Sequence, residues 1–314
     1  LENHALIPGL VNAHTHAAMS LFRGLANDLP LMDWLNNHIW PAEKKWISPK
    51  FVKDGTKLAV AEMIRSGTTC FNDMYFFSDN TAEVCVNIGM RVVIGLIVID
   101  LPTSWASNSD EYLTKGEFIH DTFKHNPLIS TAFAPHAPYT VSDDSLKRIA
   151  VLAEELDIPI HMHIHETSDE IEQSINQYGK RPLERLSDLG LLSSRLIAVH
   201  MTQLEQNEID EIKKTRVSVV HCPESNLKLA SGFCPVGKLQ KNNINVCIGT
   251  DGAASNNDLD MLGEMHITAL LAKGVNNDCA CSDAHTTLRM ATLNGAKALG
   301  MSESIGSLKK GKQA

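Results

Sequence analysis

The stretch Leu10-Val11-Asn12-Ala13-His14-Thr15-His16 joins a short apolar run to two histidines that are one residue apart. Successive side chains of a strand point to opposite faces, so His14 and His16 point the same way if this run is a strand. Imidazole is the commonest metal ligand in proteins. The pair therefore predicts half of a metal site at the end of a buried strand. The alternative interpretation is two unrelated polar residues in a loop.

Short apolar segments recur along the rest of the chain and alternate with longer stretches of helical periodicity. Such alternation is typical of a parallel sheet, and about eight strand–helix units in one domain predict a closed TIM-like (β/α)8 barrel. An open doubly wound sheet is the other possible arrangement, but no Gly-rich dinucleotide fingerprint follows any strand to support it. Strands are expected over residues 6–13, 68–72, 91–99, 129–134, 159–164, 196–200, 217–221 and 245–249.

Capping residues mark several of the expected helices. Ser142 precedes two acidic residues and predicts a helix N-cap. Thr167 and Glu170 have the spacing of a capping box, and Gly179 follows the end of the helix that they would begin. Further helices are expected over residues 51–65, 182–189, 261–273 and 286–299.

Length and composition limit the classes of protein that the chain can belong to. Its 314 residues are enough for one large core, and we expect a single barrel domain over residues 1–314 that has been trimmed from a longer protein. The net charge of −9 argues against a nucleic-acid partner, and no apolar run is long enough to span a bilayer. The seven cysteines are scattered and odd in number, which favours a reduced cytoplasmic protein over a disulfide framework.

Chemically active side chains gather at the carboxyl ends of the expected strands, where a barrel places its active site. Some of them have plain structural alternatives: Asp73 would then cap a turn, His221 would line the barrel, and two of the three alternating histidines after residue 160 would support a site or lie on the surface. The residues at these ends are His14, His16, Asp73, His136, His161, His163, His165, Glu166, His200, His221 and Asp251.

A site of three histidines and one carboxylate suits Zn²⁺ or Fe²⁺ better than Mg²⁺, which prefers an all-oxygen shell. Such an ion lowers the pKa of a bound water to about 7. A nearby carboxylate must then move protons, and Glu166, three residues after His163, is placed for that work. Asp251 is a second candidate, because it can both contact the metal and pass on a proton.

Five motifs in order along the chain resemble the amidohydrolase superfamily, and within it the 5′-methylthioadenosine/S-adenosylhomocysteine deaminases. The resemblance covers essentially the whole chain. The motifs are the run from Pro8 to His16, Pro135-His136-Ala137-Pro138-Tyr139, His163-Ile164-His165-Glu166-Thr167, Ser225-Asn226-Leu227-Lys228-Leu229, and the run from Gly249 to Asn257.

The resemblance implies a role for each matching residue. His14, His16, His163 and Asp251 would bind one divalent metal, usually zinc. Glu166 would move a proton from the attacking water to ring N1, His200 would hold and polarise the attacking oxygen, and Asp251 would protonate the leaving amine. His136 would contact the ligand. Glu43 would bind the ribose hydroxyls and Trp34 would form an aromatic wall of the pocket. Without the resemblance, Glu43 would be interpreted as an ordinary surface residue and Trp34 as an ordinary core residue.

The resemblance also implies a nucleoside substrate, a homo-oligomer, and a small β-sandwich that is largely missing here. Family members that use S-adenosylhomocysteine well can carry arginines after the third strand, whereas residues 94–104 contain none. We therefore expect a preference for uncharged 5′ groups, as in methylthioadenosine or adenosine.

Other functions remain open at this point. The same metal chemistry serves guanine, cytosine and pterin deaminases and triazine chlorohydrolases. A barrel that only binds a ligand, without metal, is a more distant alternative, and the complete ligand set together with Glu166 argues against it.

Overall fold

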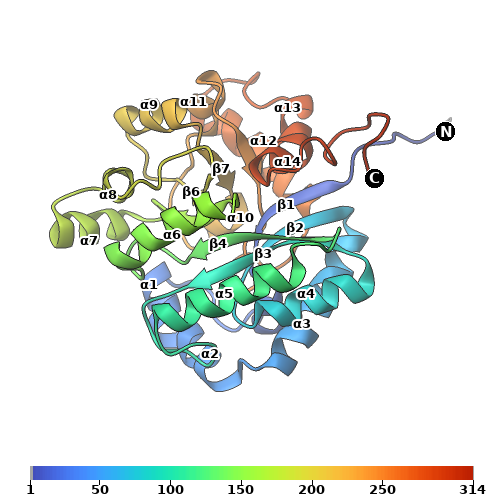
Figure 1. Cartoon of the computed structure of the whole chain (residues 1–314). Coiled ribbons are helices and arrows are strands. Elements are labelled where there is room, and N and C mark those ends of the chain that lie inside the picture. The colour runs from blue at the N-terminus through green and yellow to red at the C-terminus, as the bar shows by residue number, and fades with distance from the viewer. Residues whose placement is uncertain (1–2, 314) are drawn as a thin grey trace.

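In the computed structural model, which describes residues 3–313, eight parallel strands pair in chain order with helices around the outside (Figure 1). The predicted (β/α)8 barrel is confirmed. The predicted domain also includes residues 1, 2 and 314, which lie outside the described residues. The strands are β1 (Leu10–Thr15), β2 (Thr68–Met74), β3 (Arg91–Val98), β4 (Ile129–Pro135), β5 (Ile160–Ile164), β6 (Leu196–His200), β7 (Ser218–His221) and β8 (Val246–Ile248).

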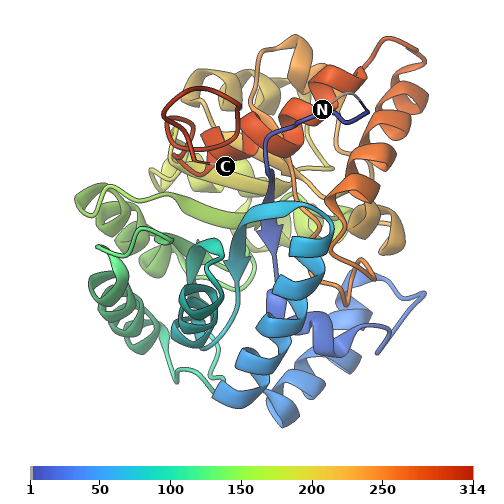
Figure 2. The same cartoon turned by 90° about the vertical axis from the view of Figure 1, so that its right-hand side faces the viewer.

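The barrel closes where the end of β8 meets β1. The Asp251 amide donates to the His14 carbonyl oxygen at 3.0 Å, and the Asn12 side chain bonds both the backbone and the hydroxyl of Thr250. The first of these contacts lies near the carboxyl ends of both strands and brings two of the predicted metal ligands together. Figure 2 shows the strands enclosed by helices from the perpendicular direction.

The first strand begins later than its apolar pattern predicted. We expected residues 6–13, whereas β1 covers Leu10–Thr15, and the side chains of Leu6 and Ile7 are 69% and 42% exposed. Leu10 pairs with Thr68, the first residue of β2, so the residues before it have no neighbouring strand in the register of this sheet. The shift places His14 inside the strand and His16 just after it.

The helices begin and end largely where the capping residues predicted. Ser142 accepts a hydrogen bond from the Ser145 amide at the start of α6, and Gly179 adopts a φ of +68° at the end of α7. The helices are α1 (Leu31–Asp33), α2 (Trp40–Trp46), α3 (Pro49–Arg65), α4 (Ser78–Ile88), α5 (Ser109–Phe123), α6 (Asp143–Glu155), α7 (Ser168–Tyr178), α8 (Pro182–Asp188), α9 (Gln206–Thr215), α10 (Pro223–Lys228), α11 (Val236–Lys241), α12 (Met261–Asn276), α13 (Ala284–Arg289) and α14 (Gly295–Ala298).

Three helical segments depart from the α-helical geometry. The expected helix over residues 286–299 is divided, because a π-helical segment separates α13 from α14. A second π-helical segment joins α1 to α2, so one winding stretch runs from residue 31 to residue 46. Such segments are rare and often lie at functional sites. The three segments are η1 (Ala17–Phe22, a 3₁₀ helix), η2 (Trp34–Ile39) and η3 (Met290–Asn294).

None of the helices within residues 3–313 combines the length and the apolar character that crossing a membrane requires.

Candidate active site

Four potential metal ligands converge at the carboxyl ends of β1, β5 and β8. Their ligand atoms all lie within 4.8 Å of one another, and they belong to His14, His16, His163 and Asp251. The Asp251 Oδ1 atom is 3.2 Å from the Nε2 atoms of both His14 and His16, and the His163 Nε2 atom is 3.1 Å from the His14 Nε2 atom. The chain brings together all four residues that the sequence predicted as metal ligands.

The far nitrogen of each imidazole is held by another group. His16 Nδ1 is 2.6 Å from the Met74 carbonyl oxygen, and His163 Nδ1 is 2.7 Å from the His136 carbonyl oxygen. Because a carbonyl oxygen only accepts, both rings carry a proton on Nδ1 and direct Nε2 toward the centre. His14 Nδ1 lies 2.8 Å from His161 Nε2. Such partners orient metal-binding imidazoles and fix their tautomers.

The electrostatics of this centre suit a cation. Burial lowers the pKa of His14 to about 4 and holds that of His163 well below its usual range, so both rings are neutral. Burial also lowers the pKa of His16, but the hydrogen bond and charge of Asp251 outweigh it and raise that pKa to about 9. Lone pairs that face each other at 3.1 Å are favourable only around a positive charge, and three imidazoles with one carboxylate are a typical donor set for zinc. These residues fit a bound zinc ion.

The two oxygens of Asp251 have different partners. Oδ1 faces the histidines and accepts a bond from the Gly252 amide at 2.8 Å. Oδ2 accepts from the hydroxyls of Ser225 at 2.6 Å and Ser255 at 2.9 Å. These bonds fix the rotation of the carboxylate, so that one oxygen always faces the ligand cluster. The sequence analysis did not assign a role to either serine, although both belong to motifs that carried the resemblance.

Glu166 lies on a turn whose backbone is held from two sides. The Glu170 carboxylate accepts from the amides of His165 and Glu166 at 2.9 and 2.8 Å, and the Thr202 hydroxyl donates to the Glu166 carbonyl oxygen at 2.7 Å. His165 has a φ of +55°, in the left-handed region. The capping box predicted for Thr167 and Glu170 is therefore half wrong. Thr167 caps the helix, but the Glu170 side chain reaches past the N-cap residue to this turn.

Burial raises the pKa of the Glu166 carboxyl, and the opposing attraction of His200 is weaker. His200 Nε2 is 3.7 Å from Glu166 Oε2, and its Nδ1 is 2.8 Å from Asn226 Oδ1. A carboxyl with a raised pKa beside an oriented imidazole is suited to accept and release a proton.

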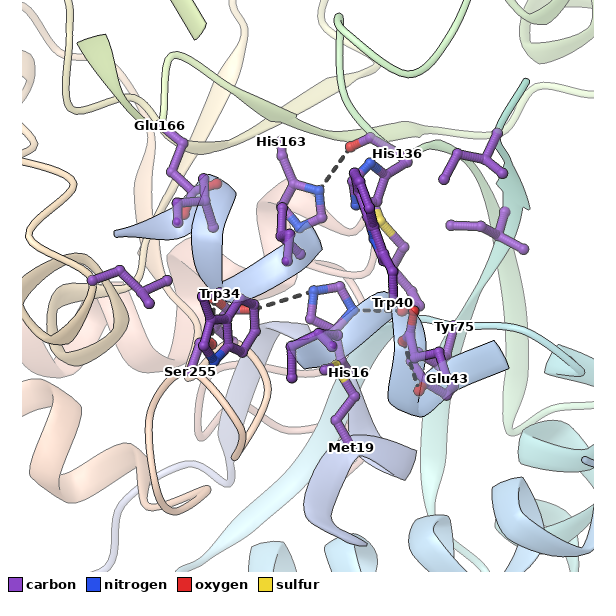
Figure 3. Close-up of a pocket in the computed structure, with 18 of the residues that line it drawn as sticks. His16, Met19, Trp34, Trp40, Glu43, Tyr75, His136, His163, Glu166 and Ser255 are labelled. Carbon is purple, nitrogen blue, oxygen red and sulfur yellow. Dashed lines mark hydrogen bonds and ion pairs between the residues drawn. The ribbon is translucent and has the colours of Figure 1, made fainter. Parts of the chain in front are cut away.

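A pocket with an empty volume of about 680 Å³ opens over these groups (Figure 3). Trp34, Glu43 and His136 all line it, as the resemblance implied. Figure 3 shows Trp34 and Ser255 on one side of His16, and Tyr75 with Glu43 on the other. Burial raises the pKa of Glu43 to about 7 against the lowering effect of a Tyr75 hydrogen bond. Burial lowers the pKa of His136 to about 3, so this ring is neutral.

The remaining polar residues at the strand ends lie outside the ligand cluster. Asp73 accepts from the Ala17 amide and the Thr15 hydroxyl, which confirms its role as a backbone cap. His165 Nε2 accepts from the Leu183 amide at 3.2 Å, and His221 is buried. His161 and His165 are both fully buried, so the surface alternative for them is wrong.

A (β/α)8 barrel with such a ligand cluster and carboxylate at its strand ends defines a metal-dependent hydrolase. The model of the amidohydrolase family matches residues 5–314, and the chain belongs to this family.

Comparison with known proteins gives close relatives. The chain is 55% identical to the 5-methylthioadenosine/S-adenosylhomocysteine deaminase of Saccharophagus degradans, over all of this chain and 70% of that protein. It superposes with a TM-score of 0.97 on an adenosine deaminase from Xanthomonas campestris that was crystallised with zinc, at 59% identity over 98% of this chain and 70% of that one. The chain shares its fold with the zinc-containing atrazine chlorohydrolase of Arthrobacter aurescens. The two superpose with a TM-score of 0.92 at 23% identity, over 98% of this chain and 74% of that one.

Proposed function

We propose that the protein catalyses the hydrolytic deamination of an adenine nucleoside, giving the inosine analogue and ammonia. The observation that carries this proposal is the arrangement of the pocket: Glu166 and His200 face the four predicted metal ligands, and Glu43 lines the same hollow. The deaminases of adenine nucleosides among the similar proteins support the same substrate class.

His14, His16, His163 and Asp251 would hold one divalent metal, zinc, with iron as the alternative. When bound, the ion would make water acidic enough to supply a nucleophile at neutral pH. The protein groups around it then handle the protons. Asp251 has a dual assignment in this scheme, as a metal ligand and as a proton carrier, while its Oδ2 atom is held by the Ser225 and Ser255 hydroxyls.

Hydrolysis at C6 of adenine requires two proton transfers to the purine. Glu166 would take one proton from the attacking water and deliver it to ring N1. Protonation of N1 makes C6 more electrophilic, so that the attacking oxygen can add to it. His200, held by Asn226, would orient and polarise the attacking oxygen. Asp251 would take the second water proton and give it to the amine, which leaves as ammonia. The water oxygen remains on C6, so the atoms balance.

Three side chains would bind the nucleoside. Trp34 would form an aromatic wall, Glu43 would accept from the ribose hydroxyls and His136 would contact the ligand, since all three line the pocket. Among the described residues, the lining includes no lysine or arginine. The loop after β3 likewise has none. A substrate carboxylate would therefore meet Glu43 without a compensating cation, which supports a preference for uncharged 5′ groups.

A substrate panel tests the activity and its specificity. The zinc-loaded protein should release ammonia from adenosine and methylthioadenosine, with a kcat/KM at least as high as for S-adenosylhomocysteine. Guanine, cytosine, a pterin and a chlorotriazine form the other arms, and chloride release would identify the last. Ammonia from guanine alone, or chloride from the triazine, would overturn the proposal.

A variant tests the assignment of Glu166. Glu166→Gln should retain the metal content of the wild type and lose most of its turnover, because the change removes a proton carrier and leaves the four ligands in place. Glu172→Gln, on the exposed side of α7, is the matched control. Full activity in Glu166→Gln would show that the proton transfer belongs to another residue.

Three coarser features belong to the same proposal. We infer one barrel domain over residues 1–314 and a homo-oligomer, and the resemblance supports both. We also infer a cytoplasmic location without nucleic-acid or membrane partners. The acidic charge and the scattered cysteines support that location. Light scattering after size exclusion tests the oligomer, since a monomer at micromolar concentration would contradict it.

A further inference from the structure

We propose that Tyr75 is a positioning residue that sets the Glu43 carboxylate for the vicinal hydroxyls of a ribose, and thereby makes the pocket selective for ribonucleosides. This inference rests on the proposed function, because it assigns Glu43 to the sugar. Nothing in the sequence motifs pointed to Tyr75, which directly follows β2.

The observation that carries the proposal is a contact between a buried tyrosine and a half-buried glutamate in two segments that are distant in the chain. The Tyr75 hydroxyl donates to Glu43 Oε1 at 2.9 Å, and the Tyr75 side chain is only 4% exposed (Figure 3). Glu43 comes from α2, in the stretch that covers the pocket, whereas Tyr75 is the first residue after strand β2 of the barrel. The bond therefore ties the covering helix to the strand end.

The remaining hydrogen-bonding capacity of Glu43 faces the ligand. An ionised carboxylate accepts about four hydrogen bonds over its two oxygens. Within residues 3–313, Tyr75 is the only side chain that donates to it, and no lysine or arginine forms an ion pair with it. Because Tyr75 engages Oε1, Oε2 is left for donors that enter the pocket. Two adjacent hydroxyls, as on a ribose, suit such an acceptor.

The same strand end also fixes the metal-ligand side of the pocket. The Met74 carbonyl oxygen holds the His16 ring at 2.6 Å, and the next residue holds Glu43. Two successive residues therefore set the separation between a predicted metal ligand and the predicted sugar acceptor. A nucleoside must span this separation, with its base at one end and its ribose at the other. If the Tyr75 hydroxyl is removed, the base end is unchanged and the carboxylate is free to rotate.

Binding measurements in a turnover-blocked background test this role. The Glu166→Gln protein, loaded with zinc, would be titrated by calorimetry with adenosine and with 2′,3′-dideoxyadenosine. Adding Tyr75→Phe should weaken adenosine binding on the order of tenfold, the usual effect of losing a hydrogen bond to a charged group. Binding of the dideoxy compound should stay within about twofold, and zinc content should not change. In a Glu43→Gln background, Tyr75→Phe should have no further effect.

The control is Tyr112→Phe, which also deletes a buried phenol hydroxyl, here bonded to Thr103 at 2.6 Å outside the pocket lining. It should not alter the ratio of the two affinities. Equal weakening of both ligands by Tyr75→Phe, or no weakening of adenosine, would overturn the proposal. If the wild type binds both compounds but deaminates neither, the proposed function fails and the affinity ratio still decides the role of Tyr75. If it binds neither, both inferences fail.

Discussion

His161 Nε2 lies 2.8 Å from His14 Nδ1, although the two residues are 147 positions apart. Both rings are fully buried. His14 can offer its Nε2 lone pair to a metal only when its proton is on Nδ1, and that proton is then donated to His161. The His161 ring must in turn carry its own proton on Nδ1, which finds no partner in the described part of the chain. His161 thus fixes the tautomer of a predicted ligand at the cost of an unsatisfied donor.

Replacing His161 should therefore weaken metal binding. We expect His161→Leu to lower zinc affinity by about 10- to 100-fold, the usual effect of removing a partner that orients a ligand. Competition with a chromogenic chelator measures it directly. His120→Leu, which loses a bond to Thr131 far from the ligands, is the control and should bind zinc like the wild type. Unchanged affinity in His161→Leu would show that His14 needs no such partner.

The turn that carries Glu166 leads to a second prediction. Glu170→Gln replaces an acceptor with an NH₂ group that faces a backbone amide, so a buried donor is left unpaired. We expect a stability loss of about 1–3 kcal/mol in urea unfolding. We also expect a lower kcat with little change in KM or zinc content, because the turn no longer holds the Glu166 side chain in position. Glu172→Gln on the same helix should change neither quantity, and equal behaviour of the two variants would contradict the role of Glu170.

The sequence pattern predicted the barrel and a pool of candidate ligands at its strand ends for a simple reason, whereas the choice of four ligands from that pool came from the resemblance. Apolar residues that recur every two positions mark the buried face of a strand, and those that recur every 3.6 positions mark the buried face of a helix. The carboxyl ends of parallel strands meet at one edge of the sheet. Residues 196–200 were predicted as a strand, and β6 has the same bounds. His14 and Asp251, 237 positions apart, are neighbours because the barrel closes.

The partners of these residues could not be read from the same patterns. The sequence analysis assigned no role to Tyr75, because its bond to Glu43 depends on where α2 packs over the barrel. The early start predicted for β1 has a similar cause, since apolar character alone does not show where a neighbouring strand begins. Glu170 matched a local capping motif, whereas its carboxylate satisfies amides one and two residues before the helix cap.

A third prediction concerns pH. Burial raises the pKa of Glu43 to about 7 in the folded protein, above the usual 4.5. The folded state therefore binds a proton more tightly, so the contribution of this group is fully present below pH 4.5 and is lost as pH rises through 7. Relative to Glu43→Gln, the wild type should lose up to about 3 kcal/mol of unfolding free energy between pH 4.5 and 8. Urea unfolding of chelator-treated proteins measures the difference, and a constant difference would place Glu43 in contact with water.

A fourth prediction tests the closure of the barrel. A Cβ atom added to Gly249, just after β8, would lie 2.8 Å from both the Cβ and the backbone nitrogen of His14. This backbone cannot move aside without displacing a predicted ligand, so Gly249→Ala should cost about 3 kcal/mol in urea unfolding and weaken zinc binding. Gly274, exposed on α12, has no atom within 4 Å of such a Cβ. Gly274→Ala should instead stabilise the protein by about 0.5–1 kcal/mol through helix propensity. If both alanines are tolerated equally, β8 does not approach β1 as closely as the structure requires.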